Sequence, residues 1–245
     1  MLYTINKTDG TQAFQYETDH DIDGVGDGGQ KRICIQYALV NNLPLTGLDL
    51  TDADLSGMDF TGKDFTGSNL NMATLAHSTL TGATLDDCNL GQADLNSAVA
   101  TNASLKNIII TKADCTNANF TGSTLTGITA LRTTLFAAVF NGCIISGDLT
   151  GSIIQNATFV GADLSGGVSI FDLTMTRAPI EQQINQFDIQ MWDGIMQIDC
   201  IAKPYTWWET VSDEYLAALP NTDVVTNWDA NKATLLQTAK NDGRY

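Results

Sequence analysis

Apolar residues recur at every fifth position through the middle of the chain. From Leu45 to Ile145, every residue whose number is a multiple of five is apolar, although only 43% of the sequence is hydrophobic. Small residues often come two positions earlier, as at Ala53, Ala73 and Ala93. After Ile145 the frame shifts by one residue and continues at Leu149, Ile154, Phe159 and Leu164. This shift predicts a bulge or a tightened corner in an otherwise regular structure.

A period of five residues fits neither the 3.6-residue period of an α-helix nor the two-residue period of a strand. The chain is therefore predicted to turn a corner in each repeat, and four corners close a coil of about 20 residues. Successive coils then stack by backbone pairing at about 4.8 Å, with the large and small apolar residues pointing inward. One predicted inward column is Phe60, Leu80, Ala100, Phe120, Phe140 and Phe159. Cys88, Cys115 and Cys143 also fall inward, and we interpret them as buried small hydrophobic residues rather than reactive thiols.

The segment before the repeats, residues 1–42, is predicted to cap the first open end of the stack. Leu2–Asn6 and Ala13–Thr18 surround an Asp-Gly turn signal and predict a hairpin. A helix is expected over Gln30–Asn42, with one side formed by Ile33, Tyr37 and Val40.

The segment after the repeats, residues 171–245, is predicted to be a small helical domain. A capping-box pattern at Thr206–Glu209, a short helix from Ser212 and a longer helix over Val224–Asn241 support this prediction. The pattern assigns no definite secondary structure to residues 180–187 or to the stretch around Trp192. The remaining tryptophans are interpreted as core rather than as an exposed docking surface: Trp207, Trp208 and Trp228.

The repeat unit resembles that of the pentapeptide-repeat family: a small residue, Asp or Asn, Leu or Phe, Ser or Thr, and any residue. Ala53–Leu55, Ala93–Leu95 and Ala162–Leu164 match the unit literally. The resemblance implies an all-β solenoid, a right-handed quadrilateral β-helix of about six coils over residues 43–170. The order of hairpin, helix, coils and Trp-rich tail also resembles that of uncharacterised phage and prophage pentapeptide proteins. The fold alone specifies no function, because one fold can host many unrelated functions.

Composition excludes several classes of protein. The chain has 245 residues, 28 acidic and 12 basic, with a net charge of -16. It has no basic run for nucleic acid and no apolar stretch of about 20 residues for a membrane. The five cysteines include no CxxC pair and the two histidines lie far apart, so neither a zinc site nor a disulfide framework is expected. The start of the sequence does not resemble a secretory signal. We therefore expect a cytoplasmic protein, in the host cytoplasm if it is phage-encoded. We expect neither an enzyme nor a cofactor.

An acidic loop before the predicted helix is a candidate calcium site. Its oxygen ligands fall at positions 1, 3, 5 and 9 of an EF-hand-like pattern, with Gly24 at the sixth. These ligands are Asp19, Asp21, Asp23 and Asp27. Gln30 replaces the expected Glu at the twelfth position, and Gly26 stands where an apolar residue is usual. The alternative is an acidic loop before a helix whose N-terminus favours Asp.

The acidic coil surface is a second candidate site. Family members that protect bacterial DNA gyrase look like duplex DNA and dimerise through their C-terminal ends, so the resemblance implies a DNA mimic. Six coils make about 29 Å, along which DNA presents on the order of 17 charges. The coil region has 11 acidic and 4 basic residues, so the mimicry is incomplete. The aspartates expected to face a partner are Asp49, Asp54, Asp59, Asp64, Asp94 and Asp114. Alternatively, Asp is simply a good outward residue that keeps the coils soluble.

A third candidate is a set of apolar residues at outward positions. Val99 and Val139 are predicted to lie on the same face, two coils apart. The others are Ile109, Ile144 and Ile153. A cluster of such residues on a polar surface would mark a partner interface.

The leading functional hypothesis is a non-enzymatic protein-binding module, a partial DNA mimic that modulates a DNA-handling enzyme such as a topoisomerase or a defence nuclease. The alternative is a structural or spacer component of a phage particle or larger assembly. Self-association through an end or through the C-terminal region is a further expectation.

Overall fold

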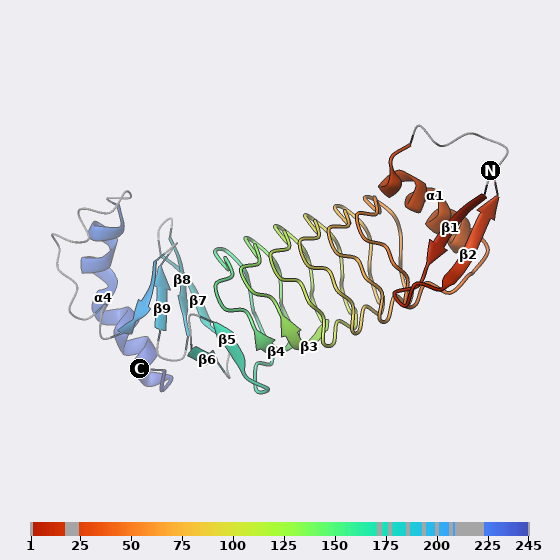
Figure 1. Ribbon diagram of the computed structural model, residues 1–245. Coiled ribbons are helices and arrows are strands. Elements are labelled where there is room, and N and C mark those ends of the chain that lie inside the picture. The colour runs from red at the N-terminus through yellow and green to blue at the C-terminus, as the bar shows by residue number, and fades with distance from the viewer. Residues whose placement is uncertain are drawn as a thin grey trace. The chain divides into compact units, whose positions relative to one another are not determined.

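The structure is a computed structural model (Figure 1). It describes residues 2–17, 25–170, 173–175, 178–184, 187–192, 195–198, 201–205, 208 and 223–244. The chain divides into two compact units, Met1–Thr174 and Met175–Tyr245.

The middle of the first unit is a stack of four-sided coils. Parallel backbone bridges join each outward residue to the residue 20 positions later, as in the pair Asp49↔Asn69. Four such ladders run along the stack, and we name its sides by their first residues: side A from Asp49, side B from Asp54, side C from Asp59 and side D from Asp64. The first coil is residues 46–65. The predicted 20-residue coil is therefore confirmed, while its right-handedness stays a prediction.

The interior of the stack consists of the residues at the five-residue period. All of the predicted positions from Leu45 to Ile145 are buried, with relative exposures of 3% or less. The predicted phenylalanine column is present in the later coils. The rings of Phe120 and Phe140 stack with centroids 5.2 Å apart, and those of Phe140 and Phe159 stack at 5.1 Å. The inward column forms a continuous core because the coil length equals four repeats.

The smaller inward positions accept short polar side chains as well as alanine. Ser68 Oγ donates to Leu45 O at 2.9 Å, and Thr133 Oγ1 donates to Ile110 O at 2.6 Å. Each donor thus reaches a carbonyl 23 residues earlier in the chain. This bond removes most of the cost of burying the hydroxyls of Ser68 and Thr133, whereas the Ser78 hydroxyl is buried without a hydrogen-bond partner among the described residues.

The frame shift after Ile145 is a bulge between β3 (Thr124–Thr129) and β4 (Ile144–Asp148). The pairing changes from Leu125↔Ile145 to Ile128↔Gly147, which removes one residue from the coil. Later bridges accordingly span 19 residues, as in Val139↔Thr158. The sheet continues to β5 (Val168–Ile170) and β6 (Leu173–Met175). The predicted bulge is confirmed.

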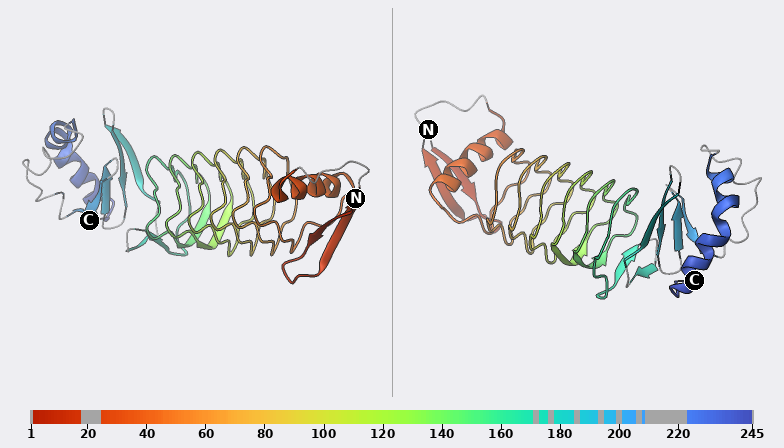
Figure 2. Two further views of the ribbon diagram at one scale, coloured as in Figure 1. Left: turned by 45° about the horizontal axis from the view of Figure 1, so that its top comes forward. Right: turned by 180° about the vertical axis from the view of Figure 1, so that it is seen from behind.

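The N-terminal segment covers one end of the coils, as Figures 1 and 2 show. The hairpin strands β1 (Leu2–Asn6) and β2 (Gln12–Glu17) are antiparallel, and α1 spans Asp27–Val40. The amide of Asp49 donates to Asn6 O at 2.8 Å, so the hairpin pairs with the edge of side A. The predicted hairpin and helix are confirmed to within a few residues.

The side of α1 formed by Ile33, Tyr37 and Val40 is not the buried face of the helix. Cys34, Ile35 and Ala38 are buried, whereas Val40 is 82% exposed and Tyr37 36% exposed. The helix turns Lys31 and Arg32 toward the first coil, where both donate to backbone carbonyls. A prediction that considers apolar residues alone does not recognise a packing face that contains cations.

The second unit contains a sheet, so the prediction of a helical C-terminal domain was wrong. Four antiparallel strands lie in the order β10-β9-β8-β7: β7 Ile180–Ile184, β8 Phe187–Met191, β9 Ile195–Ile198 and β10 Ile201–Pro204. The strands are short and rich in isoleucine, which favours pairing. The predicted longer helix is confirmed as α4, Asp223–Asn241.

Two predicted features of the second unit can be compared with the structure only in part. Trp208 is fully buried, and its Nε1 donates to Met196 O at 2.8 Å, as expected for a core residue. Leu235, Leu236 and Ala239 of α4 are buried. The predicted short helix from Ser212 and the side chains of Trp207 and Trp228 lie outside the described residues.

Candidate functional site

The aspartates of the coil surface are fixed by local hydrogen bonds. Asp59 Oδ1 accepts from the amide and hydroxyl of Thr61 at 2.9 and 2.6 Å, and Asp64 Oδ1 accepts from Thr66 at 2.9 and 2.5 Å. Asn119 makes the same two bonds with Thr121 at 3.0 and 2.7 Å. These two hydrogen bonds therefore need a carboxylate or amide oxygen, but they do not need a negative charge.

These hydrogen bonds lower the pKa of several carboxyl groups. The side-chain bond from Ser56 is the main cause for the lowered pKa of Asp54, and the bond from Thr61 is the main cause for that of Asp59. The bond from Ser165 acts in the same way on the pKa of Asp163. The ionised form accepts these bonds better than the protonated form does, so these groups stay charged to a lower pH than free Asp.

We expect the free energy of unfolding to fall as the pH drops below about 4. The folded chain binds protons at these carboxylates less readily than the unfolded chain does. Their contribution is complete above the unfolded pKa and disappears as the pH falls through the lowered folded values. Urea unfolding at about pH 6 and about pH 3 checks this, with Asp59→Asn expected to show a smaller difference than the parent. Equal stability of the parent at both values would contradict the account.

The N-terminal cap pairs with the aspartates and carbonyls of sides A and B in the first coil. Lys31 Nζ donates to Thr51 O at 2.6 Å, and Arg32 Nη1 donates to Ser56 O at 2.8 Å. Arg32 also lies 3.4 Å from Asp54 Oδ1, and the positive charge of Lys31 acts on Asp49. Asp49 and Asp54 were predicted to face a partner, but cations of α1 partly compensate their charges. The sequence signal that was missed is the Lys-Arg pair one turn into the helix.

In the described part of the N-terminal cap, no cation pairs with sides C and D of the first coil. Asp59 and Asp64 are exposed, and among the described residues none accepts a hydrogen bond from their amides. Lys63 occupies an inward position where a small residue is usual. Charged and inward-pointing cationic residues are typical protection for an open β-edge. We call residues 59–64 the uncapped edge.

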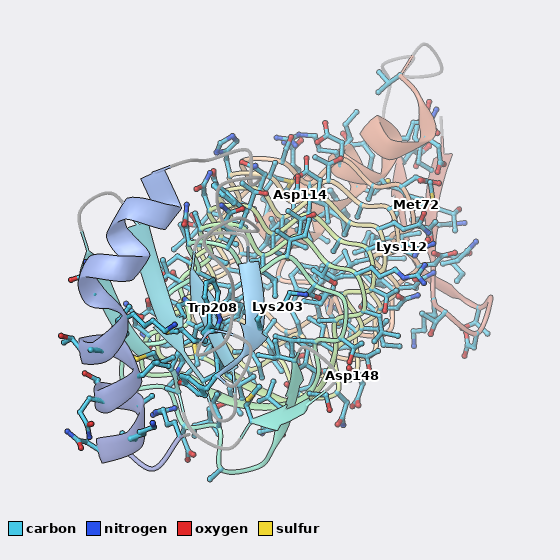
Figure 3. All side chains as sticks on the ribbon, turned by 90° about the vertical axis from the view of Figure 1, so that its left-hand side faces the viewer. Met72, Lys112, Asp114, Asp148, Lys203 and Trp208 are labelled. Carbon is cyan, nitrogen blue, oxygen red and sulfur yellow. The ribbon has the colours of Figure 1, made fainter. Side chains whose placement is uncertain are left out.

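The negative charge of the chain is concentrated at the two ends of the sequence. Residues 1–65 contain eleven acidic and four basic residues, a net charge of -7. Residues 66–145 contain four Asp and three Lys or Arg, a net charge of -1. Asp94 and Asp114 are neighbours on side B, but Lys112 and Arg132 lie at the adjacent corner. Asp114 and Lys112, both labelled in Figure 3, are exposed. The middle coils are therefore close to neutral.

The outward apolar residues do not form one cluster. Val99 and Val139 both lie on side C as predicted, with Asn119 between them on the ladder. Val99 is 38% exposed, whereas Val139 is half-buried. The others lie on the remaining sides: Ile109 on side A, Ile153 on side B and Ile144 on side D.

The candidate calcium site stays a prediction. Asp19, Asp21 and Asp23 lie outside the described residues. Asp27 is the first residue of α1 and pairs with Lys31, whose Nζ lies 2.9 Å from Asp27 Oδ2. This position matches the alternative, in which an acidic residue favours the N-terminus of a helix.

The cysteines of the coils behave as core residues. Burial raises the pKa of the Cys88 thiol to about 12 and that of Cys143 to about 11, and it also raises the pKa of Cys115. Cys88 Sγ and Cys143 Sγ donate to carbonyls of the previous coil at 3.0 and 2.9 Å. The thiolate is the nucleophilic form, so these three thiols stay unreactive at neutral pH.

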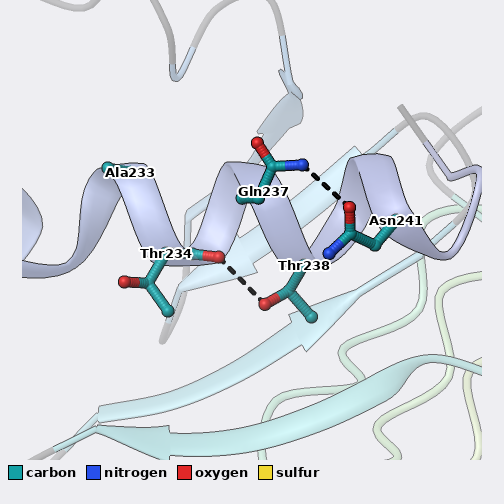
Figure 4. A pocket seen from close by; sticks show the side chains of 5 residues that line it. All are labelled: Ala233, Thr234, Gln237, Thr238 and Asn241. Atoms are coloured by element: carbon teal, nitrogen blue, oxygen red, sulfur yellow. Dashed lines mark hydrogen bonds between the residues drawn. The ribbon is translucent and has the colours of Figure 1, made fainter.

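A depression along α4 is lined only by neutral side chains (Figure 4). Two hydrogen bonds bridge successive turns of the helix there. Gln237 Nε2 donates to Asn241 Oδ1 at 2.8 Å, and Thr238 Oγ1 donates to Thr234 O at 2.9 Å. Both bonds join groups within α4 itself, and the five lining residues include no acid, base or thiol.

Comparison with known families finds the family described as pentapeptide repeats. Its pattern matches residues 49–87, 88–127 and 113–147, with eight copies. The comparison with curated proteins found no match. Among the described residues, no helix has the length and apolar character needed to cross a membrane.

Several solved structures are similar to the repeat region. A trypsin-treated variant of QnrB1, a plasmid-mediated fluoroquinolone resistance protein, is 22% identical with a TM-score of 0.37, covering 47% of this chain and 60% of that one. HetL, involved in heterocyst differentiation regulation in Nostoc sp. strain PCC 7120, is 23% identical with a TM-score of 0.28, covering 51% and 66%. The chain thus spans less than two thirds of either protein. The alr5209 protein of Nostoc is 22% identical with a TM-score of 0.35, covering 40% and 82%.

Proposed function

Through residues 49–147 the chain belongs to the pentapeptide-repeat family, and we propose that it is a non-catalytic module that binds another protein. Its binding site is the uncapped edge of the first coil, where Asp59 and Asp64 are exposed. The partner presents a basic groove of the kind that holds DNA, as in a topoisomerase or a defence nuclease.

The observation that supports this proposal most directly is the fixed geometry of these two carboxylates. Each is held by two hydrogen bonds from a threonine two residues later. A side chain that is already ordered loses less conformational freedom on binding. Fixed negative charges therefore meet a basic surface at low entropic cost and also speed the encounter.

The mimicry is restricted to one end of the coils. The first coil carries Asp49, Asp52, Asp54, Asp59 and Asp64, whereas residues 66–145 are nearly neutral. Duplex DNA would present an unbroken series of charges along the same length. We therefore propose a local contact with a basic groove rather than replacement of a long DNA segment.

The second candidate is a structural or spacer role in a larger assembly such as a phage particle. The neutrality of the middle coils favours it, because such a surface packs against other proteins without a salt-sensitive attraction. Exposed charges are screened over about 8–10 Å at physiological ionic strength. Binding through the aspartates should therefore weaken as salt rises, whereas packing in an assembly through the neutral coils should change little.

DNA supercoiling by bacterial gyrase in the presence of increasing protein tests the first candidate. If gyrase is the partner, the parent chain should inhibit supercoiling, and Asp59→Asn with Asp64→Asn should abolish the inhibition. Asn119 shows that asparagine preserves the turn, so the double variant removes charge with little change in structure.

The matched control is Asp94→Asn with Asp114→Asn, which removes two charges from the same repeat position on side B. It should inhibit like the parent. Inhibition lost equally in both double variants would show that net charge, rather than the uncapped edge, is responsible. No inhibition by the parent at large molar excess would eliminate gyrase as the partner.

A further inference from the structure

One half of the middle coils contains no charged side chain. Four segments of ten residues lie along sides C and D and carry no Asp, Glu, Lys or Arg: 76–85, 96–105, 116–125 and 136–145. All seven charged residues between 66 and 145 lie in the other half of their coils. We call the four segments the uncharged half. It is unusual because the whole chain has a net charge of -16.

The surface of the uncharged half is regular and partly apolar. Thr79, Val99, Asn119 and Val139 follow one another on the side C ladder, one coil apart. Ile144 on side D is 48% exposed. At the corner between these sides the hydroxyls of Thr81 and Thr101 are hydrogen-bonded at 3.1 Å. Valine, threonine and asparagine thus present a surface that packs without desolvating a charge.

We propose that a second copy of this chain docks on the uncharged half, side against side. Two chains of charge -16 repel each other, and contact through the other half of the middle coils would bring Asp86, Asp87, Asp94 and Asp114 of both copies close together. Within residues 76–145, the uncharged half lets two copies approach without bringing acidic residues into contact, while Asp59, Asp64 and Asp163 lie on the same sides beyond its two ends. The ladders repeat at the same spacing in both copies, so a twofold arrangement matches like residues across the interface.

This docking surface begins one coil after the uncapped edge, on the same two sides, and includes neither Asp59 nor Asp64, which would bind a basic partner. It also differs from an association through an end of the chain. The four coils extend over about 19 Å, which is short for an interface of standard size. We therefore expect a reversible, concentration-dependent dimer rather than an obligate one.

Sedimentation equilibrium over a range of concentrations up to about 1 mM tests this inference. The parent mass should rise from 26.3 kDa toward twice that value. Val99→Asp should weaken the dimer at least about tenfold, because it places like charges in the twofold interface. Ile109→Asp on side A should leave the dimer unchanged.

These two variants are closely matched. Val99 is 38% exposed and Ile109 is 42% exposed, and both occupy the same repeat position. Each is followed two residues later by threonine, Thr101 or Thr111, as Asp59 is followed by Thr61. The new aspartates therefore suit the turn in both variants. Val139→Asp is a second variant on the same ladder, and urea unfolding confirms that each variant is folded.

Salt gives an independent outcome. Screening the remaining repulsion should maintain or strengthen the dimer as ionic strength rises, whereas binding at the uncapped edge should weaken. A parent chain that stays monomeric over the whole range would overturn the inference. A dimer that survives both Val99→Asp and Val139→Asp would also overturn it and would place the interface elsewhere on the chain.

Discussion

Replacement of Phe140 by alanine should lower the free energy of unfolding of the coils by about 3–5 kcal/mol. Phe140 is 2% exposed, and its ring stacks between those of Phe120 and Phe159. Removing the ring leaves a cavity inside a column whose backbone is fixed by pairing on both sides. The stack cannot collapse to fill it, so both the transfer energy and the packing energy are lost.

Phe136 provides the control for this prediction. It belongs to the same coil but lies at a corner, half-buried. Phe136→Ala should cost less than about 1.5 kcal/mol, because its ring lies at the surface of the coil and is only partly buried. Chemical denaturation of both variants measures the difference. Equal losses in the two variants would show that the inward register is incorrect.

Replacement of Gly147 by alanine should be destabilising by about 3 kcal/mol or more. Gly147 has a φ of 130° at the bulge, a value that residues with a Cβ rarely adopt. An added Cβ would clash with the carbonyl of Ile128 and lie 2.6 Å from its nitrogen. The neighbouring strand would have to move, which would disturb the pairing of β3 with β4.

Gly142 is the matched control, because it has a positive φ of 65° but no atom within 4 Å of an added Cβ. Ala137 occupies an equivalent corner at a φ of 54°, so alanine is accepted there. Gly142→Ala should cost about 1–2 kcal/mol, the usual penalty for this conformation. Thermal or urea unfolding separates the two variants. A Gly147→Ala variant as stable as Gly142→Ala would contradict the bulge.

The coils could be predicted from sequence because one repeated requirement governs every position. Each fifth residue must fill the interior, so a single frame from Leu45 to Ile145 identifies the inward residues. The shift to Leu149 was visible for the same reason. The glycine that accommodates it at position 147 was not singled out, because its role depends on close approach of the Ile128 backbone.

The ends of the chain were harder to predict because their packing does not follow one period. In α1 the contact face includes Lys31 and Arg32, which bind carbonyls left open by the first coil. In the second unit, strands of four or five residues are too short to establish a clear alternation. Pairing with neighbouring strands determines the secondary structure of such short segments more than their own sequence does.

The candidate site was predicted by residue type but not by arrangement. The aspartates lie on the surface as expected, yet Asp49 and Asp54 are partly compensated by α1. Which aspartates remain uncompensated depends on where the cap lies, and that is a property of the fold. The uncharged half likewise becomes apparent only when the sides of the coils are known.

The most direct test of the proposed binding module is capture of proteins from a bacterial lysate by three immobilised forms of the chain. These are the parent, the Asp59→Asn and Asp64→Asn double variant, and the Asp94→Asn and Asp114→Asn double variant. We predict that the parent and the side B variant retain the same DNA-handling protein at low salt, and that the uncapped-edge variant does not. Retention of identical proteins by all three forms would contradict a binding site at Asp59 and Asp64.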